Sequence, residues 1–397
     1  MVNNLVDKSV LISGSGIAGL TTAWWLKKYG FNPTIIEHAS GLRKGGYMID
    51  FWGVGYDITE KMGLLEELKR AHYEIAKLAF VNEENKKVGG FNIRKMRKRL
   101  NFRHVNLLRS DLEQILYNHV KDKVNILYNL SIDSIEQSEK DISVKLSDGS
   151  TKTFDYIVGA DGQHSNVRNL LFGPEHQFEK FLGYYTASYT LDNFLDEDRI
   201  FYSYTIPKTQ IGLYSIRGNR IATFFIWRSH QLEYPHHDVE RKKRILRETF
   251  QNIKWYTPDL LNALDKTADF YFDAVSQIDM NQWYNNRVVL VGDACQCVSL
   301  IAGEGSGLAM AGSYILAGEL KASNGDHQLA FENYQKKMKP EIVRKQAMAQ
   351  DFAGTFVPDT KTSLWFRNKM SGLITAPIFS KYFINRFLSD TLVFDDY

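Results

Sequence analysis

The clearest pattern of apolar and polar positions covers residues 9–40. Residues 9–12 form a short apolar run of the kind found in buried strands. A helical pattern follows a glycine-rich stretch and ends near Gly30. Its apolar positions are Leu20, Ala23, Trp24 and Leu26. A second apolar run, residues 33–37, comes directly after it. The pattern therefore predicts a strand, a helix and a second strand, which is the repeating unit of α/β proteins.

Two later stretches repeat the order of a strand followed by a helix. In the first, the apolar run 156–160 leads through an Asp-Gly turn to a helix that starts near Ser165. In the second, a strand over residues 287–291 leads through a glycine-rich loop to a helix over residues 305–320. Both stretches predict further segments of an α/β domain.

Residues 107–116 predict another amphipathic helix. Its apolar positions are Leu108, Leu112, Ile115 and Leu116. We expect Ser110 to be its N-cap, with Glu113 three residues later completing a capping box. Residues 142–156 alternate between apolar and polar around an Asp-Gly pair, which predicts a β-hairpin.

The middle and the end of the chain follow different patterns. Residues 176–275 are aromatic and alternating, which predicts antiparallel strands. Residues 326–354 are helical with an interruption or bend at Pro340, and residues 363–388 are apolar and aromatic with spaced basic side chains. For this tail, a helix packed on the body, a lid, a dimer contact and a membrane-surface helix all stay open.

Composition and charge narrow the class of protein. The chain has 397 residues, of which 44% are hydrophobic, and a formal net charge of +3, so nothing global favours a nucleic-acid partner. The basic run 86–104 is either a solvated surface or a patch that attracts an anionic cofactor. Two cysteines, no signal-peptide pattern and no run of about 18 apolar residues lead us to expect a cytoplasmic protein without a membrane span.

The loop after the first strand carries the strongest chemical signal. It reads Gly-x-Gly-x-x-Gly, where one glycine makes the tight turn, one lets the backbone approach a pyrophosphate and one lets the helix approach the strand. The predicted cofactor-binding residues here are Gly14, Ser15, Gly16, Ile17, Ala18 and Gly19. Glu37, 18 residues after the last glycine, is placed to accept both ribose hydroxyls of an adenosine, which favours FAD or NAD over a 2′-phosphorylated dinucleotide.

Longer motifs resemble those of one enzyme family. The spacing of Gly14, Gly16, Gly19, Ala23, Leu26, Gly30 and Glu37 is similar to that of the FAD-binding unit of flavoproteins. A second string is met by Asp161, Gly162, Ser165, Val167 and Arg168, and a third by Gly292, Asp293, Ala294, Gly303 and Gly305. In this order, the motifs resemble those of the single-component FAD-dependent aromatic hydroxylases, typified by p-hydroxybenzoate hydroxylase.

The resemblance implies a fold class and domain limits. It implies an α/β protein with a Rossmann-like FAD-binding domain, an inserted antiparallel β-sheet substrate domain and a C-terminal helical segment. We expect the FAD-binding domain to be discontinuous, over residues 1–80, 101–175 and 276–330. The substrate domain is then 176–275 and the C-terminal helices 331–397.

The resemblance also adds candidate site residues. Further cofactor-binding candidates are His38, Arg43, Asp50, Arg109, Asp161, Gly292, Asp293, Gly303, Gly305 and Ser306. Asp293 is expected at the ribityl chain, and the helix start at 305 is expected to point N–H groups at the flavin pyrimidine. Arg220 and Arg228 are weaker candidates for an acidic or enolic substrate. We name no catalytic acid or base, because the flavin supplies most of the catalysis in this family, and we expect no metal.

The third motif departs from the family pattern. Gln296 replaces a frequent histidine, Leu300 the usual proline and Glu304 a glutamine. Because a carboxylate beside a reduced, anionic flavin is unfavourable, we expect Glu304 to face away, or else the site to be altered. Cys295 and Cys297 lie in the same loop, but a C-x-C pair without further ligands is too small for a structural zinc site, so we interpret both as small loop residues.

The activity implied is a monooxygenase reaction. FAD would be reduced by NADPH or NADH, and O₂ would then supply an OH group to a phenolic or enolic polycyclic small molecule. Residues 43–65, 270–294 and 311–320 look closest to the tetracycline-inactivating branch of the family. Two alternatives stay open: an FAD-dependent dehydrogenase or reductase of another small molecule, and a flavin-binding protein without turnover. We expect a monomer or weak dimer.

Overall fold

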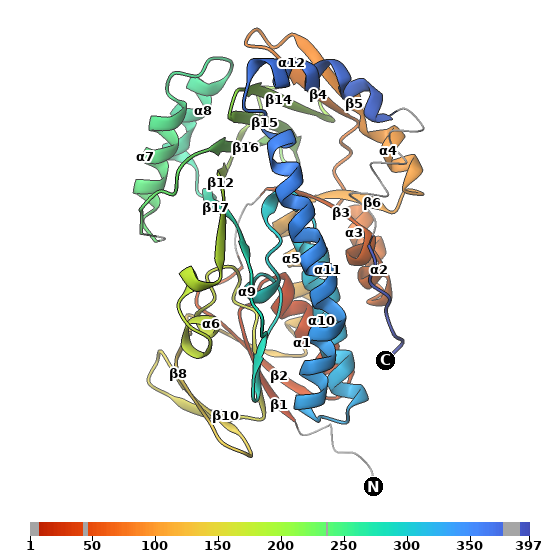
Figure 1. Ribbon diagram of the computed structural model, residues 1–397, viewed down its shortest axis with the longest axis vertical. Coiled ribbons are helices and arrows are strands. Elements are labelled where there is room, and N and C mark those ends of the chain that lie inside the picture. The colour runs from red at the N-terminus through yellow and green to blue at the C-terminus, as the bar shows by residue number, and fades with distance from the viewer. Residues whose placement is uncertain (1–7, 43–46, 236, 376–389) are drawn as a thin grey trace.

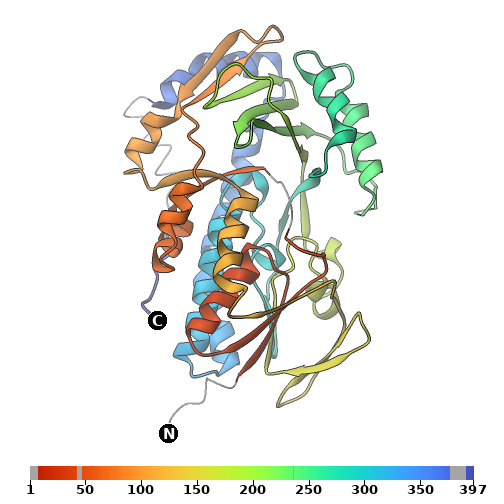
Figure 2. The same cartoon turned by 180° about the vertical axis from the view of Figure 1, so that it is seen from behind.

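Two sheets lie at opposite ends of the protein, with most of the helices between and beside them. The computed structural model describes residues 8–42, 47–235, 237–375 and 390–397. A six-stranded sheet forms one end and an eight-stranded sheet the other, while the long helix α11 (His327–Phe356) runs from one end toward the other (Figure 1). The view from behind shows α5 (Arg109–Val120) and α1 (Ile17–Lys28) beside this helix layer (Figure 2).

The six-stranded sheet is the predicted α/β unit, and its strands are in the order β18-β19-β11-β1-β2-β7. All neighbouring pairs are parallel except β18 with β19. The strands are β1 (Ser9–Ser13), β2 (Asn32–Glu37), β7 (Asn125–Tyr128), β11 (Tyr156–Gly159), β18 (Tyr284–Asn285) and β19 (Val288–Leu290). The first strand–helix–strand unit and the strands before the two later glycine-containing loops are therefore confirmed.

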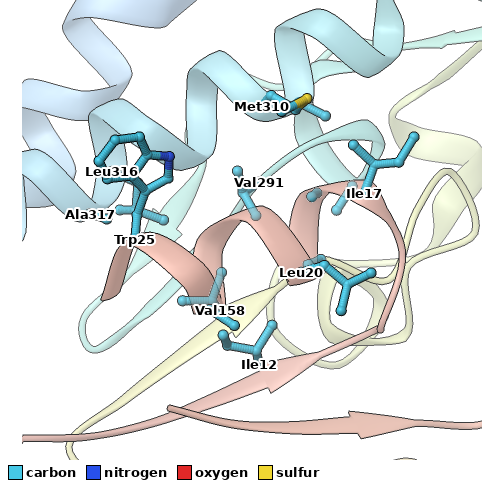
Figure 3. Packing of buried hydrophobic residues seen from close by; sticks show 14 of the residues in the cluster. Ile12, Ile17, Leu20, Trp25, Val158, Val291, Met310, Leu316 and Ala317 are labelled. Carbon is cyan, nitrogen blue, oxygen red and sulfur yellow. The ribbon is translucent and has the colours of Figure 1, made fainter. Parts of the chain in front are cut away.

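Helix α1 is packed between this sheet and α10 (Gly305–Ala322). Apolar side chains of α1 pack against those of β1, β11 and α10 (Figure 3). The centroid of the Trp25 ring lies 4.6 Å from that of Tyr314 on α10. Burial of these apolar side chains is the main force holding the layers together. The packing has no room for a larger residue at Gly19, where an added Cβ would lie 1.9 Å from the Gly14 carbonyl oxygen.

The eight-stranded sheet contains more of the chain than the alternating stretch alone. It runs β17-β12-β16-β15-β14-β4-β5, with β13 paired to β16. Its strands are β4 (Lys77–Val81), β5 (Lys87–Asn92), β12 (Glu179–Ser188), β13 (Thr190–Asp192), β14 (Ile200–Ile206), β15 (Thr209–Ile216), β16 (Arg220–Arg228) and β17 (Tyr271–Ile278). The expected domain limit at residue 80 thus falls inside a strand of this sheet, and β4 pairs in parallel with β14.

Helices cover one face of the larger sheet. Residues 176–275, expected to be strands, also contain α7 (Val239–Phe250) and α8 (Thr257–Ala263). The rings of Phe225 and Trp227 meet Phe250 of α7, so the aromatic side chains of this face form core. The opposite face is left to line a cavity.

Smaller elements complete the fold. These are β3 (Met48–Trp52), β6 (His104–Leu108), β8 (Ile132–Gln137), β9 (Ile142–Leu146), β10 (Thr151–Phe154), α2 (Gly53–Lys61), α3 (Leu65–Arg70), α4 (Ile93–Arg99), α6 (Asn166–Leu171), α9 (Asp293–Gln296) and α12 (Lys361–Met370). Strands β9 and β10 form the predicted hairpin, and β3 pairs with β6. Short 3₁₀ turns cover Glu175–Gln177, Leu264–Lys266, Leu300–Ala302 and Ser371–Thr375.

The structure corrects the expected start of α5 and describes only part of the C-terminal tail. The prediction that Ser110 caps its helix is wrong, because α5 begins at Arg109 and its N-cap is Leu108. Pro340 lies inside one helix, α11, so the expected interruption at this residue is wrong, and a bend there stays a prediction. For the tail, α12 contacts β5 and β14, and residues 376–389 lie outside the described residues. Within the parts of the chain that the structure describes, no helix has the length and apolar character needed to cross a membrane.

Candidate active site

A cavity of about 450 Å³ lies where the two sheets and the helix layer meet. Its walls come from the start of α1, from β3 and β6, from the larger sheet, from the loop before α10 and from α11. The predicted site residues that line it are Gly16, Ile17, Ala18, Asp50, Arg109, Asp293, Gly303, Gly305 and Ser306. Segments far apart in the sequence therefore meet at one site.

The start of α1 offers free backbone donors to this cavity. Gly16 is the N-cap of the helix, and no side chain of the described residues caps the first turn. An added Cβ at Gly16 would lie 3.6 Å from Oε1 of Glu113 and 3.7 Å from Nη2 of Arg109, so the protein itself leaves this side of the glycine open. An uncapped helix N-terminus with a positive dipole end binds anions such as a diphosphate.

Glu37 fixes the glycine loop from the end of β2. Its carboxylate accepts hydrogen bonds from the Ser15 N–H at 2.8 Å, the Ser15 hydroxyl at 3.0 Å and the Ala39 N–H at 2.9 Å, and it pairs with His38 Nδ1 at 2.8 Å. Burial alone would raise the pKa of Glu37, but these hydrogen bonds lower it to about 2. The carboxylate is thus ionised and oriented. Its expected contact with ribose hydroxyls, and that of the largely exposed His38, stay predictions.

Arg109 reaches the cavity from the start of α5. Its guanidinium pairs with Glu113 at 2.7 Å, and Glu113 is itself buried. Sequence reasoning assigned Glu113 to a capping box and missed this role. The pair places one cation beside Gly16, where an anionic cofactor is expected.

Asp161 and its neighbours stabilise the loop before α6. The Asp161 carboxylate accepts hydrogen bonds from the Ser165 hydroxyl and from the Val167 N–H at 3.0 Å. Arg168 is fully buried and donates to the Ala294 carbonyl at 2.9 Å, which ties this loop to the third motif. Asp161 does not line the cavity, and its contact with FAD stays a prediction.

The third motif begins with Asp293 at the first position of α9. Gly292 precedes it with φ of +63°, a conformation that favours glycine. The Asp293 side chain is open to the cavity but enclosed by protein, and burial raises its pKa. Cys295 and Cys297 are free and buried, and burial raises the pKa of both thiols, so neither is a reactive thiolate at neutral pH.

The departures from the family pattern have partners that the sequence did not reveal. Gln296 is buried, and its Nε2 donates to the Tyr334 hydroxyl at 2.5 Å. Leu300 lines the cavity. Glu304, expected to face away, also lines the cavity, but its carboxylate binds the Lys345 ammonium of α11 at 2.6 Å. The unfavourable charge is therefore paired inside the site.

A polar corner, formed by Asp50, Arg97, His104 and Asn106, lies on β3, α4 and β6. Oδ1 of Asp50 accepts from His104 Nε2 at 3.0 Å and from Asn106 Nδ2. Arg97 lines the cavity beside them and contacts His72. Arg97 and His104 belong to the basic run 86–104, which was the signal in the sequence for this part of the site. Nothing in the sequence pointed to Asn106.

Other predicted residues lie elsewhere. Arg220 and Arg228 do not line the cavity: Arg220 bonds to Thr190 at 2.7 Å, and Arg228 pairs with Asp359. The arrangement gives no support to the substrate contacts expected of them. The wall on the larger sheet is instead formed by Phe201, Gln210, Tyr214, Phe224, Tyr271 and Ala274. Arg43 lies outside the described residues.

These features fit FAD. The start of α10, like that of α1, has no side-chain cap among the described residues, and its first residues Gly305 and Ser306 line the same cavity. One uncapped helix start beside Arg109 suits the diphosphate, and the other suits a ring that gains negative charge. Asp293 lines the same cavity, with its Oδ1 3.7 Å from the position of a Cβ at Gly305, and offers an acceptor for hydroxyl groups.

Comparison with known proteins decides the family. The sequence profile described as FAD binding domain matches residues 7–340. The chain belongs to this FAD-binding family. An uncharacterized protein of Mycobacterium tuberculosis is 36% identical over 356 residues, covering 87% of this chain and 93% of the relative. A flavin-dependent monooxygenase of Legionella longbeachae is 32% identical over 373 residues, covering 93% and 95%.

A solved structure extends this likeness to the whole fold of the FAD-binding chain. The crystal structure of tetracycline destructase Tet(51) matches with a TM-score of 0.86 and 28% identity, covering 98% of this chain and 100% of that one. The predicted fold class, the flavoprotein family and the class of flavin-dependent monooxygenases are thereby confirmed. The roles of the individual site residues stay predictions.

Proposed function

We propose that this FAD-dependent monooxygenase takes electrons from NADPH or NADH and uses O₂ to hydroxylate a phenolic or enolic polycyclic small molecule. A tetracycline-type antibiotic is the first candidate substrate. The observation that carries the proposal is a cavity with an aromatic wall on one side and a polar corner on the other, next to the residues that fit FAD.

The polar corner supports a substrate that carries hydroxyl groups. Asp50 accepts hydrogen bonds from His104 Nε2 and Asn106 Nδ2, which leaves His104 Nδ1 and Asn106 Oδ1 as acceptors. Neither atom has a hydrogen-bond partner among the described residues, although both are buried. A substrate with O–H or N–H donors would satisfy them, and Arg97 would favour an enolate or carbonyl oxygen nearby.

The aromatic wall supports a flat, ring-containing substrate. Phe201, Tyr214, Phe224 and Tyr271 present rings from the larger sheet. Stacked or edge-on contacts with such rings bind planar molecules and exclude water from the reacting face. When bound, FAD supplies the electron transfer and the oxygen activation. The residues of this chain hold and orient the substrate against it.

The tetracycline candidate is supported by the whole-length likeness to a tetracycline destructase, including the C-terminal helices. The experiment is to purify the yellow protein and to follow NADPH and O₂ consumption with tetracycline and with simple phenols. Substrate-stimulated NADPH oxidation with a product one oxygen atom heavier supports hydroxylation. NADPH loss that yields only hydrogen peroxide contradicts the proposal. A product changed by two hydrogens also contradicts it and favours the dehydrogenase or reductase alternative.

A further inference from the structure

A buried group of charges joins three segments beside the cavity. Lys345 of α11 is 1% exposed, and its ammonium lies 2.6 Å from Glu304 and 3.0 Å from Asp390. Glu304 is the N-cap residue of α10, and Asp390 belongs to the C-terminal segment 390–397. The Asp390 carboxylate also accepts the Val54 N–H of α2 at 2.9 Å, which fixes its position.

We propose that Glu304 and Lys345 form an ion pair that sets the reduction potential of FAD bound at the start of α10, with Asp390 holding Lys345 in place. Both members of the pair line the cavity, and Glu304 directly precedes the first residue of the helix whose N-terminus faces it. A charge so placed acts on the cofactor through protein rather than water, so its effect is large. The inference rests on FAD binding and is independent of the substrate.

The charge of the pair changes with pH. Burial raises the pKa of Glu304 to about 7, against the lowering effect of Lys345 and with a further rise from Asp390 and Glu341. Above pH 7 the pair is neutral, and below it the Glu304 carboxyl is protonated, so that the Lys345 charge is opposed only by Asp390 and Glu341. The other charged groups near the pair are Glu341 and Arg344 on α11, and the other charged residues that line the cavity are Asp50, Arg97, Arg109 and Asp293.

The test is the midpoint potential of bound FAD in the wild type and in Glu304→Gln at pH 8.5 and 5.5. At pH 8.5 the variant keeps the positive charge of Lys345 but lacks the negative charge of Glu304. The site is then more positive, and this stabilises the more negative reduced flavin. We expect about a tenfold gain in the preference for reduced over oxidised FAD, which is about 30 mV for a two-electron couple. At pH 5.5 the two proteins should agree, since Glu304 is then uncharged in both.

Glu319→Gln is the matched control. Glu319 lies on the same helix, pairs with Lys337 of α11 at 2.5 Å, and is joined there by Asp395 of the C-terminal segment. It does not line the cavity. Its variant should lower the melting temperature without moving the potential at either pH.

Lys345→Met is a second test, and it should shift the midpoint potential of bound FAD in the opposite direction to Glu304→Gln. At pH 5.5 it removes a positive charge that Glu304 no longer balances in the wild type, so its potential should be lower than that of the wild type. The proposal is overturned if Glu304→Gln and the wild type have equal potentials at both pH values, if the shift is the same at both, or if Glu319→Gln shifts equally. A chain that binds no FAD would instead contradict the family assignment.

Discussion

Single side chains at this site owe their behaviour to partners distant in the sequence. Glu304 is held by Lys345, 41 positions later, and Arg168 donates to the Ala294 carbonyl, 126 positions later. Motifs identified Glu304, Arg168 and Ala294, but they did not show that the last two are bonded, and Lys345 lies in a segment without a recognisable motif. The sequence therefore predicts which loops meet the cofactor and does not predict how their charges are compensated.

Asn106 tests the role of the polar corner. Asn106→Leu keeps the volume but removes both the donor to Asp50 and the unpartnered acceptor. We expect about a tenfold increase in KM for a hydroxyl-rich substrate, since one hydrogen bond to a buried polar group contributes about 1–3 kcal/mol. FAD affinity, measured by titration of the apoprotein, should stay the same. An unchanged KM would remove Asn106 from the substrate site.

His164 links the two ends of the molecule through its ring nitrogens. Nδ1 lies 2.8 Å from Glu175, and Nε2 lies 3.3 Å from Asp273 on β17 of the larger sheet. Burial lowers the pKa of His164, but the two carboxylates outweigh it and raise the pKa to about 10. The charged His164 therefore stabilises the folded protein fully below about pH 6.5, and this contribution is lost as the pH rises toward 10.

The corresponding experiment compares urea unfolding of the wild type and of His164→Gln between pH 6 and 10. The free energy of unfolding of the wild type should fall across this range more steeply than that of the variant. Parallel curves would mean that His164 does not carry this pH dependence.

At the level of elements, strands and helices were largely predictable because their apolar positions repeat with clear periods. The start of α5 could not be predicted, because it depends on a contact with a segment distant in the sequence. Strand β6 runs directly into the helix at Leu108, and the Arg109 N–H donates to the Tyr47 carbonyl at 3.2 Å. Backbone pairing thus satisfies the first N–H of α5, and Ser110 already lies inside the helix, where it cannot be the N-cap.

The glycine loop and α1 give a pair of variants that separate binding from folding. Gly16 has room for a methyl group on the protein side, whereas a methyl group at Gly19 would collide with the Gly14 carbonyl oxygen. Gly16→Ala should leave the melting temperature of the apoprotein nearly unchanged and weaken FAD binding at least tenfold. Gly19→Ala should destabilise the apoprotein by about 1–3 kcal/mol. Equal effects of both variants on the apoprotein would contradict the assignment of Gly16 to cofactor approach.

For the whole molecule, the general plan could be predicted and its exact division could not. The order of the motifs indicated an FAD-binding part interrupted by a sheet. That β4 and β5 belong to the larger sheet follows from pairing with β14 and could not be predicted, because strand pairing over more than a hundred residues has no local signal. The cavity lies between these parts. The sequence predicted the wall formed by the glycine-containing loops but not the wall formed by the larger sheet.

The C-terminal region completes the site from outside the predicted nucleotide-binding segments. Helix α11 supplies Lys345, Met348 and Ala349 to the cavity, and segment 390–397 supplies Asp390 behind it. Residues from near the N-terminus to near the C-terminus therefore contribute to the site. This agrees with the likeness to a destructase structure over 98% of the residues.

The most direct test of the central claim is the fate of oxygen in a turnover under ¹⁸O₂ with NADPH and a tetracycline or polycyclic phenol. Hydroxylation predicts a product 18 mass units heavier than the substrate, because one ¹⁸O atom is inserted for each molecule of NADPH oxidised. A product whose added oxygen comes from water, or NADPH oxidation without any labelled product across these substrates, would contradict the account.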